Sequence, residues 1–215
     1  MKLYIMRHGE TDWNKQGILQ GSTDITLNAC GIQMAEITGV GLKKDNIVFD
    51  RIFSSPYLRA KTTAEIIARD LGCEITIAPQ LREMCFGKYE GHKISEFRTN
   101  PEYTEINKFF YDPAHYRSEG NAENFEEVFT RIQDFLAESI LPLEDTCENV
   151  LIVCHTAIIR AFICLINKMS LEDYWSIYLP NCSVSLAKVE NGQITMAEEN
   201  HVYYECYKNA RNRFV

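Results

Sequence analysis

Two histidines and an arginine stand where apolar runs of the sequence end. Arg7 and His8 follow the run that begins at Lys2, and His155 directly follows NVLIVC, which ends at Cys154. An imidazole can act as a nucleophile, a general base or a metal ligand, whereas a guanidinium binds oxyanions through its planar fork of donors. A metal site is disfavoured because Arg7 would repel a cation and the histidines show neither HxH nor HExxH spacing. Arg7 should also lower the pKa of His8 and keep its imidazole neutral.

Arg59 and Glu83 are two further charged residues that could take part in binding or catalysis. Arg59 lies in the first turn of a helix that we expect to begin at Pro56, with Ser55 as its N-cap. A cation there is disfavoured by about 0.3–1 kcal/mol unless an oxyanion binds, although a plain solvated arginine is the alternative. Glu83, in LREMCFGKYEG, is a proton donor, a salt-bridge partner of Arg82 or a solvated loop residue. Burial raises a carboxyl pKa and cations lower it, so the sequence leaves this pKa open.

Neutral donors lie near these charged residues in the sequence. Asn14, Gln20 and Gly21 follow the first apolar run, and Thr156 follows the second histidine. Such groups can complete a phosphate cradle without adding charge, although polar loop residues are common in any protein. If a helix begins at Thr156, its backbone N–H and that of Ala157 are free to point toward the same ligand.

The elements that must position these residues alternate between strands and helices. We expect strands at 2–6, 51–54, 74–77 and 149–154, and a hairpin of 183–189 and 194–197 that turns at Asn191-Gly192. We expect helices from the N-cap Asn28 to about Lys44, and at 56–71, 125–141 and 156–166. Uninterrupted apolar strands between helices indicate a three-layer α/β/α sandwich with a mainly parallel central sheet. Ligands bind beyond the carboxyl ends of such strands, which is where the two histidines, Arg59 and Glu83 fall.

The segment between the third strand and the 125–141 helix is rich in aromatic residues. It indicates a helical cap inserted at about 84–120 into a single domain of 215 residues. These aromatic side chains either contact a substrate or pack against one another. The aromatic tail from His201 to Val215 is able to dock on the body or on a partner, so a homodimer is one option that the sequence leaves open.

Composition narrows the classes of function. The net charge of −8 argues against nucleic acid and anionic membrane surfaces as partners. No segment is long and apolar enough to span a membrane, and the N-terminal run is too short for a signal peptide. The eight cysteines form no CxxC pair, so we expect reduced thiols in a cytoplasmic protein.

The motifs taken together resemble the histidine phosphatase superfamily, the phosphoglycerate-mutase-like proteins, from Lys2 to about Val189. The blocks that carry the resemblance are RHGETDWN (7–14), QG (20–21), SSPYLRAKTTA (54–64), LREMCFGKYEG (81–91), GNAENFEEV (120–128), VCHTAIIR (153–160) and NCSV (181–184). The resemblance implies an α/β sandwich with a helical insertion.

The resemblance also implies a role for each matching residue. His8 is expected to be the nucleophile that becomes phosphorylated, while Arg7, Arg59 and His155 bind the transferring phosphoryl group. Glu83 occupies the position of the proton donor. The positions of Asn14 and Gln20-Gly21 contribute phosphate or substrate contacts in the family, and neither a metal nor a cofactor is needed.

Three functions fit the resemblance. A phosphomonoesterase acting on a small phosphorylated metabolite is favoured, because LREMCFGKYEG looks more like the small phosphatases, such as α-ribazole phosphatase, than like the mutases. A phosphoglycerate mutase is the alternative, although the chain lacks the arginine-rich RRSYD-type segment of mutases. A non-catalytic phospholigand-binding protein is disfavoured because every core group is present. Thr156, Cys154 and Asn124 replace the glycine and two serines usual in the family, which puts substrate fit in question.

Overall fold

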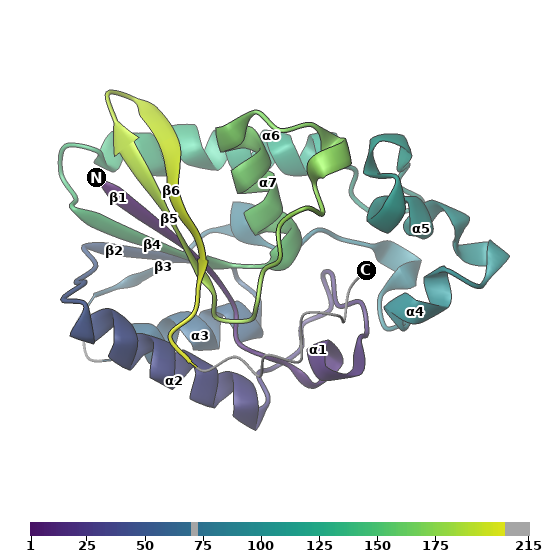
Figure 1. The fold of residues 1–215 in the computed structure, drawn as a ribbon, viewed down its shortest axis with the longest axis horizontal. Coiled ribbons are helices and arrows are strands. Elements are labelled where there is room, and N and C mark those ends of the chain that lie inside the picture. Colours follow the sequence, from purple (N-terminus) through teal and green to yellow (C-terminus); the bar gives the residue numbers. More distant parts are fainter. Residues whose placement is uncertain (70–72, 205–215) are drawn as a thin grey trace.

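The computed structural model describes residues 1–69 and 73–204 (Figure 1). In this part of the chain, six strands form one mixed sheet in the order β3-β2-β4-β1-β5-β6. The strands are β1 (Lys2–Arg7), β2 (Arg51–Ser54), β3 (Ile75–Ile77), β4 (Asn149–Cys154), β5 (Val184–Glu190) and β6 (Gln193–His201). β3, β2, β4 and β1 run parallel to one another. β5 pairs antiparallel with β1, and β6 pairs antiparallel with β5. The prediction of an α/β fold with a mainly parallel sheet is confirmed.

Helices cover both faces of the sheet. The α-helices are α1 (Asp12–Gln16), α2 (Ala29–Lys44), α3 (Leu58–Ala68), α4 (Ile94–Phe97), α5 (Thr104–Tyr111), α6 (Phe125–Phe135) and α7 (Thr156–Asn167). Figure 1 shows α2 and α3 on one face and α6 and α7 on the other. Alternate residues of β1 enter the two cores, with Leu3 and Ile5 on the side of α6 and α7 and Tyr4 and Met6 on the side of α2 and α3. None of the described helices is long and apolar enough to cross a lipid bilayer.

The register of the central strands brings the two histidines together. Arg7 is the last residue of β1 and lies opposite Cys154, the last residue of β4. His8 and His155 therefore leave the sheet at the same level, and the backbone N–H of His8 donates to the carbonyl of Cys154 at 3.0 Å. On the other side of β4, the N–H of Ser55 donates to a carbonyl of the same strand, so three chain segments converge at this edge.

The start of α3 differs from the prediction. The helix begins at Leu58 with Tyr57 as its N-cap, rather than at Pro56 with Ser55 as its N-cap. The hydroxyl of Ser55 accepts from the N–H of Tyr57 at 3.3 Å, which forms a turn before the helix. The first helical N–H, on Leu58, donates to the carboxylate of Asp24 at 2.8 Å, so a distant loop supplies the cap.

The start and end of α6 have clear local causes. Asn124 accepts from the N–H of Glu127 at 2.9 Å, and Glu127 accepts in return from the N–H of Asn124 at 2.8 Å. This reciprocal pair is a capping box, so asparagine at the family's serine position still starts the helix. After α6, a π-helical turn of Leu136–Ile140 leads into a short 3-10 helix that contains Pro142. The predicted stop at this proline therefore lies close to the observed one.

Two other predicted boundaries are the hairpin turn at Asn191-Gly192 and the end of the 56–71 helix. Asn191 and Gly192 join β5 to β6 with φ values of 54° and 71°, which is the backbone that a two-residue hairpin turn requires. Leu71, the predicted end of the 56–71 helix, lies outside the described residues.

Aromatic side chains hold together the segment between β3 and α6. Figure 1 shows α4 and α5 of this segment beyond the end of the sheet. Phe109 is 1% exposed, and its ring centroid lies 4.8 Å from that of Phe86, 5.2 Å from Trp175 and 5.4 Å from Phe125. The structure therefore supports mutual packing for these residues, which we considered as an alternative to contact with a substrate.

Candidate active site

His8 is buried at the carboxyl end of β1 as a neutral imidazole. Its side chain is 3% exposed, and its Nδ1 lies 2.7 Å from the carbonyl oxygen of Gly9. Because a carbonyl only accepts, Nδ1 carries the proton and Nε2 keeps its lone pair. Burial, with the nearby Arg59 and Arg7, holds the pKa of His8 well below its usual range. Gly9 is required because a Cβ there would lie 2.5 Å from the carbonyl oxygen of Gly31.

Arg59 is fully buried and is held by backbone carbonyls. Its Nη2 donates to Gly21 at 2.7 Å and its Nη1 donates to Thr23 at 2.8 Å. Its Nε donates to the Nδ1 of His155 at 3.2 Å. The alternative of a solvated surface arginine is therefore wrong. The carbonyl dipoles offset part of the unfavourable placement of a cation in the first turn of α3.

His155 faces the first histidine from the end of β4. The ring centroids of His8 and His155 lie 5.1 Å apart. The Nδ1 of His155 accepts from Arg59, so its Nε2 carries the proton and donates to the hydroxyl of Ser55 at 2.6 Å. Burial and the charge of Arg59 hold the pKa of His155 well below its usual range. The imidazole is thus neutral here, and it can donate to a phosphoryl oxygen as a cation only if the anion raises its pKa.

Arg7 presents an unused donor beside the nucleophile. Its Nη1 donates to the carbonyl of Leu179. Its Nε is buried and has no hydrogen-bond partner among the described residues. A buried guanidinium with a spare N–H is suited to an incoming oxyanion.

Glu83 is a buried carboxyl with a raised pKa. It is 8% exposed and accepts from the N–H of Met84 at 3.0 Å and from the N–H of Ala157 at 3.3 Å. Burial raises the pKa of Glu83, and the positive charge of Arg59 only partly opposes this shift. The proposed surface pair with Arg82 is absent, since that arginine binds a different carboxylate at 2.8 Å.

One predicted donor of the α7 N-terminus is already used. The N–H of Ala157 was expected to be free for a ligand, but it donates to Glu83. The N–H of Thr156, the first residue of α7, stays a predicted ligand donor.

Two of the neutral residues predicted to contact phosphate, Asn14 and Gln20, are tied into one network around Thr11. Asn14 accepts through Oδ1 from the N–H of Thr11 at 3.1 Å and from the amide of Asn181 at 3.3 Å, which fixes the orientation of its own amide. Gln20 is 8% exposed and accepts from the hydroxyl of Thr11 at 3.1 Å. Gly21 holds Arg59 through its carbonyl. Direct phosphate contacts of these three residues stay a prediction.

The sequence interpretation missed Glu90, which shapes the loop beneath Arg59. Its carboxylate accepts from the backbone N–H groups of Ser22, Thr23 and Phe86 at 2.8, 2.9 and 3.0 Å. Gly21 has a φ of +54°, and a Cβ on it would lie 2.2 Å from Oε1 of Glu90. The only signal in the sequence was an acidic residue before a glycine in LREMCFGKYEG.

Two other features bear on where a ligand can bind. Within residues 1–69 and 73–204, no group of three or more histidine, cysteine, aspartate or glutamate side chains could hold a metal ion.

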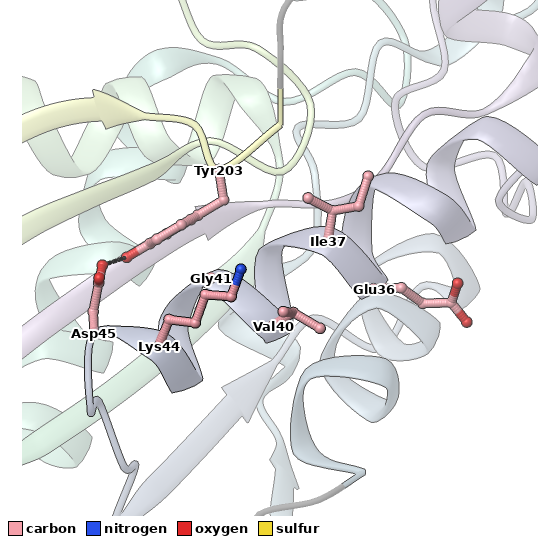
Figure 2. A pocket seen from close by; sticks show the side chains of 7 residues that line it. All are labelled: Glu36, Ile37, Val40, Gly41, Lys44, Asp45 and Tyr203. Atoms are coloured by element: carbon pink, nitrogen blue, oxygen red, sulfur yellow. Dashed lines mark hydrogen bonds between the residues drawn. The ribbon is translucent and has the colours of Figure 1, made fainter.

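A hollow of about 370 Å³ lies on the outer surface of α2, where Tyr203 packs over the helix and its hydroxyl donates to Asp45 (Figure 2). None of the predicted site residues lines that hollow.

The fold and the site together define a class of protein. A neutral imidazole stands at the carboxyl edge of an α/β sheet, with two buried guanidinium groups, a second imidazole and a protonatable carboxyl around it. Such a site is suited to bind a phosphoryl group and to transfer it to a nitrogen nucleophile.

Comparison with known proteins gives the family. The model of the histidine phosphatase superfamily (branch 1) matches residues 3–201, so the chain belongs to this superfamily. It is 33% identical over 196 residues to "Probable phosphoglycerate mutase GpmB" of Salmonella choleraesuis, covering 90% of this chain and 87% of that protein.

Solved structures show the same fold. A phosphoserine phosphatase mutant from Entamoeba histolytica in complex with phosphoserine has a TM-score of 0.80 and 28% identity, over 93% of this chain and 96% of that one. The α-ribazole phosphatase of Shigella flexneri has a TM-score of 0.81 and 27% identity, over 94% and 96%. With these relatives, the superfamily match shows that the protein is a phosphatase.

Proposed function

We propose that the protein hydrolyses small phosphomonoesters in the cytoplasm through a phosphohistidine intermediate on His8. The observation that carries this proposal is the hydrogen bond from Nδ1 of His8 to the carbonyl of Gly9. It fixes the tautomer whose Nε2 lone pair is available for attack. The same carbonyl stabilises the positive charge that the ring gains when Nε2 bonds to phosphorus.

The groups around His8 are suited to hold the phosphoryl group during transfer. Arg7 offers its unpaired Nε, Arg59 is fixed by carbonyls, and the N–H of Thr156 starts a helix. His155 already carries a proton on Nε2, because its Nδ1 accepts from Arg59, and this N–H can donate to a phosphoryl oxygen in place of the Ser55 hydroxyl. Charge on the equatorial oxygens is thereby stabilised in the transition state.

Glu83 supplies the proton that the leaving group needs. As Nε2 of His8 bonds to phosphorus, the bond from phosphorus to the ester oxygen breaks, and the protonated Glu83 donates to that oxygen. The resulting carboxylate then takes a proton from water, whose oxygen attacks phosphorus and breaks the bond to His8. Free phosphate leaves, and Glu83 is protonated again.

Replacement of the nucleophile tests this proposal. His8→Ala should lower kcat/KM for p-nitrophenyl phosphate by at least about 10⁴-fold, because no other group then accepts the phosphoryl group. His115→Ala is the matched control, since His115 is exposed and pairs only with the nearby Asp112 in the described structure. Activity of His8→Ala close to that of the wild type would refute the proposal.

A mutase is the second candidate because of the similarity to GpmB. The two functions share phospho-His8 and differ in the acceptor, which is water for the phosphatase and a phosphoglycerate for the mutase. Incubation with 3-phosphoglycerate separates them. We expect release of inorganic phosphate, whereas rapid formation of 2-phosphoglycerate without phosphate release would favour the mutase.

A further inference from the structure

Glu123 is a buried residue that holds the chain on both sides of Glu83. It is 9% exposed and lies just before α6. Its backbone N–H donates to the carbonyl of Cys85 at 2.8 Å, and its Oε2 accepts from the N–H of Cys85 at 2.9 Å. Its Oε1 accepts from Nη2 of Arg82 at 2.8 Å. Because Arg82 comes directly before Glu83 and Cys85 follows shortly after it, one residue fixes the segment at both ends.

Arg131 of α6 anchors Glu123 from the other side. Its Nε donates to Oε1 of Glu123 at 3.0 Å and its Nη2 donates to Oε2 at 3.2 Å, so the pair is bidentate. Its Nη1 donates to the carbonyl of Gln80, which lies just ahead of the same segment. Arg131 and Glu123 are both buried. The pair therefore ties the segment that carries Glu83 rigidly to α6.

The position of the Glu83 carboxyl depends on this backbone. In the described part of the chain, its oxygens accept only from the N–H groups of Met84 and Ala157, at 3.0 and 3.3 Å. No described side chain donates to it. A shift of the segment would therefore move the carboxyl directly, because nothing else holds it in place.

Glu123 also controls the charge that Glu83 experiences. Six ionisable side chains from different elements act on Glu83, and they are Arg7 after β1, Arg59 of α3, Arg131 of α6, Cys154 of β4, Arg160 of α7 and Tyr174. Burial raises the pKa of Glu83, and the positive charges of Arg59 and Arg131 oppose this rise. Of these four arginines, Arg131 forms an ion pair within the described structure, and its partner is Glu123. Glu123 thus offsets part of the positive charge that favours ionised Glu83.

We propose that Glu123 is a positioning residue for the proton donor, which holds the carboxyl of Glu83 at the leaving-group oxygen and, by pairing with Arg131, keeps it protonated. This role rests on the proposed function, in which Glu83 donates to the leaving group. Glu123 touches no substrate in this scheme and acts through Cys85 and Arg131. Its effect on the rate is nevertheless large, because a displacement of about 1 Å at a reacting group costs up to about 100-fold.

Glu123→Gln tests the proposal because glutamine keeps the size of the side chain and removes its charge. In this variant, kcat/KM for an alkyl phosphate should fall by about 10- to 100-fold. The loss for p-nitrophenyl phosphate should be much smaller, since its leaving group needs no proton. The falling limb of the pH profile should move to lower pH, because the charge of Arg131 is no longer offset. Glu126→Gln, which removes an exposed carboxylate from the first turn of α6, is the matched control and should behave as the wild type.

Variants of Arg131 separate the charge from the position. Arg131→Met should move the falling limb to higher pH, because it removes a positive charge that favours ionised Glu83. The double variant Glu123→Gln/Arg131→Met removes both charges and should bring the limb back toward that of the wild type. Its kcat/KM for the alkyl phosphate should stay low, because the segment is still released. A purely structural role would not move the limb in opposite directions in the two single variants.

Several results would overturn the proposal. Equal losses for the two substrates in Glu123→Gln do so, as does a limb that moves in the same direction, or not at all, in both single variants. If Glu123→Gln does not fold, the double variant decides, because it leaves no buried unpaired charge of this pair. A wild-type rate for the alkyl phosphate in the double variant is then the contradiction.

Glu83→Gln distinguishes this proposal from the proposed function. If Glu83→Gln loses activity mainly on the alkyl phosphate and Glu123→Gln does not, the positioning role alone is wrong. If Glu83→Gln itself loses activity equally on both substrates, Glu83 is not the proton donor, and the role of Glu123 is wrong with it.

Discussion

The phosphate site and the aromatic segment beside it are built by different forces. In the site, backbone groups hold the charged side chains, as the carbonyls of Gly21 and Thr23 hold Arg59. In the segment of residues 84–120, packed rings around Phe109 provide the structure. Phosphoryl chemistry therefore depends on the charged residues of the site, whereas stability depends on the packed rings around Phe109. Substitutions in one region should therefore leave the property of the other largely unchanged.

Loss of Arg59 should have the largest effect on catalysis. Arg59→Met should lower kcat/KM by about 10³–10⁵-fold, as expected for an arginine that stabilises a transferring phosphoryl group. The free energy of unfolding should fall by only about 1–3 kcal/mol, because the carbonyls of Gly21 and Thr23 lose a donor while a buried charge is removed. Steady-state kinetics and urea denaturation measure the two effects. Arg69→Met is the control, since Arg69 directly follows the same helix and its side chain is 62% exposed. A large loss of stability without loss of activity would break the comparison.

Loss of the proton donor should have the next largest effect. Glu83→Gln should lower kcat for an alkyl phosphate by about 10²–10⁴-fold, the usual range for acid–base catalysis. The loss should be smaller for p-nitrophenyl phosphate, whose leaving group needs no proton. Equal losses for both substrates would contradict a proton-donor role.

The pH dependence of kcat/KM for an alkyl phosphate reports the protonation of His8 and of Glu83. Activity should rise with pH through the lowered pKa of His8, below its usual value of about 6.5, because only the neutral ring attacks. Activity should fall again through the raised pKa of Glu83, because only the protonated carboxyl donates. Glu83→Gln should remove the falling limb and keep the rising limb. A falling limb that persists in this variant belongs to another group.

The aromatic segment gives the converse prediction. Phe109→Ala should lower the free energy of unfolding by about 3–5 kcal/mol, because it opens a cavity at the centre of the ring cluster. The folded fraction should still hydrolyse p-nitrophenyl phosphate at a rate near that of the wild type. Tyr111→Ala is the control, since Tyr111 is 48% exposed. A loss of activity that exceeds the unfolded fraction would show that the two regions are coupled.

Glu90 should show the smallest of these effects. Glu90→Gln replaces one acceptor oxygen with a donor that faces the N–H groups of residues 22, 23 and 86. The loop carbonyls that hold Arg59 should shift, and kcat/KM should fall by about tenfold, the size of one lost charge-assisted hydrogen bond. Glu65→Gln, on the exposed side of α3, should have no effect. An unchanged rate for Glu90→Gln would show that the loop keeps its shape without this carboxylate.

Much of this site could be predicted because its groups follow strands. Buried apolar runs indicate where β1 and β4 end, and parallel strands end at one edge of a sheet, so His8 and His155 meet. Glu90 was missed because its partners, the N–H groups of residues 22, 23 and 86, lie in irregular loops that no periodicity predicts.

Local rules failed where a distant residue supplied the partner. Ser55 looked like a helix cap, but Asp24 caps α3 and Ser55 binds His155. The N–H of Ala157 looked free, but Glu83 reaches it from another segment. In both cases the tertiary contact satisfies a backbone group that the sequence leaves open.

Direct detection of the phosphorylated residue tests the central claim most sharply. The wild type is mixed with p-nitrophenyl phosphate and quenched at alkaline pH, where phosphohistidine survives, and its peptides are analysed by mass spectrometry. The account predicts one phosphoryl group on the peptide that contains His8, and none in His8→Ala. Phosphorylation of any other residue, or continued turnover by His8→Ala, would contradict the account.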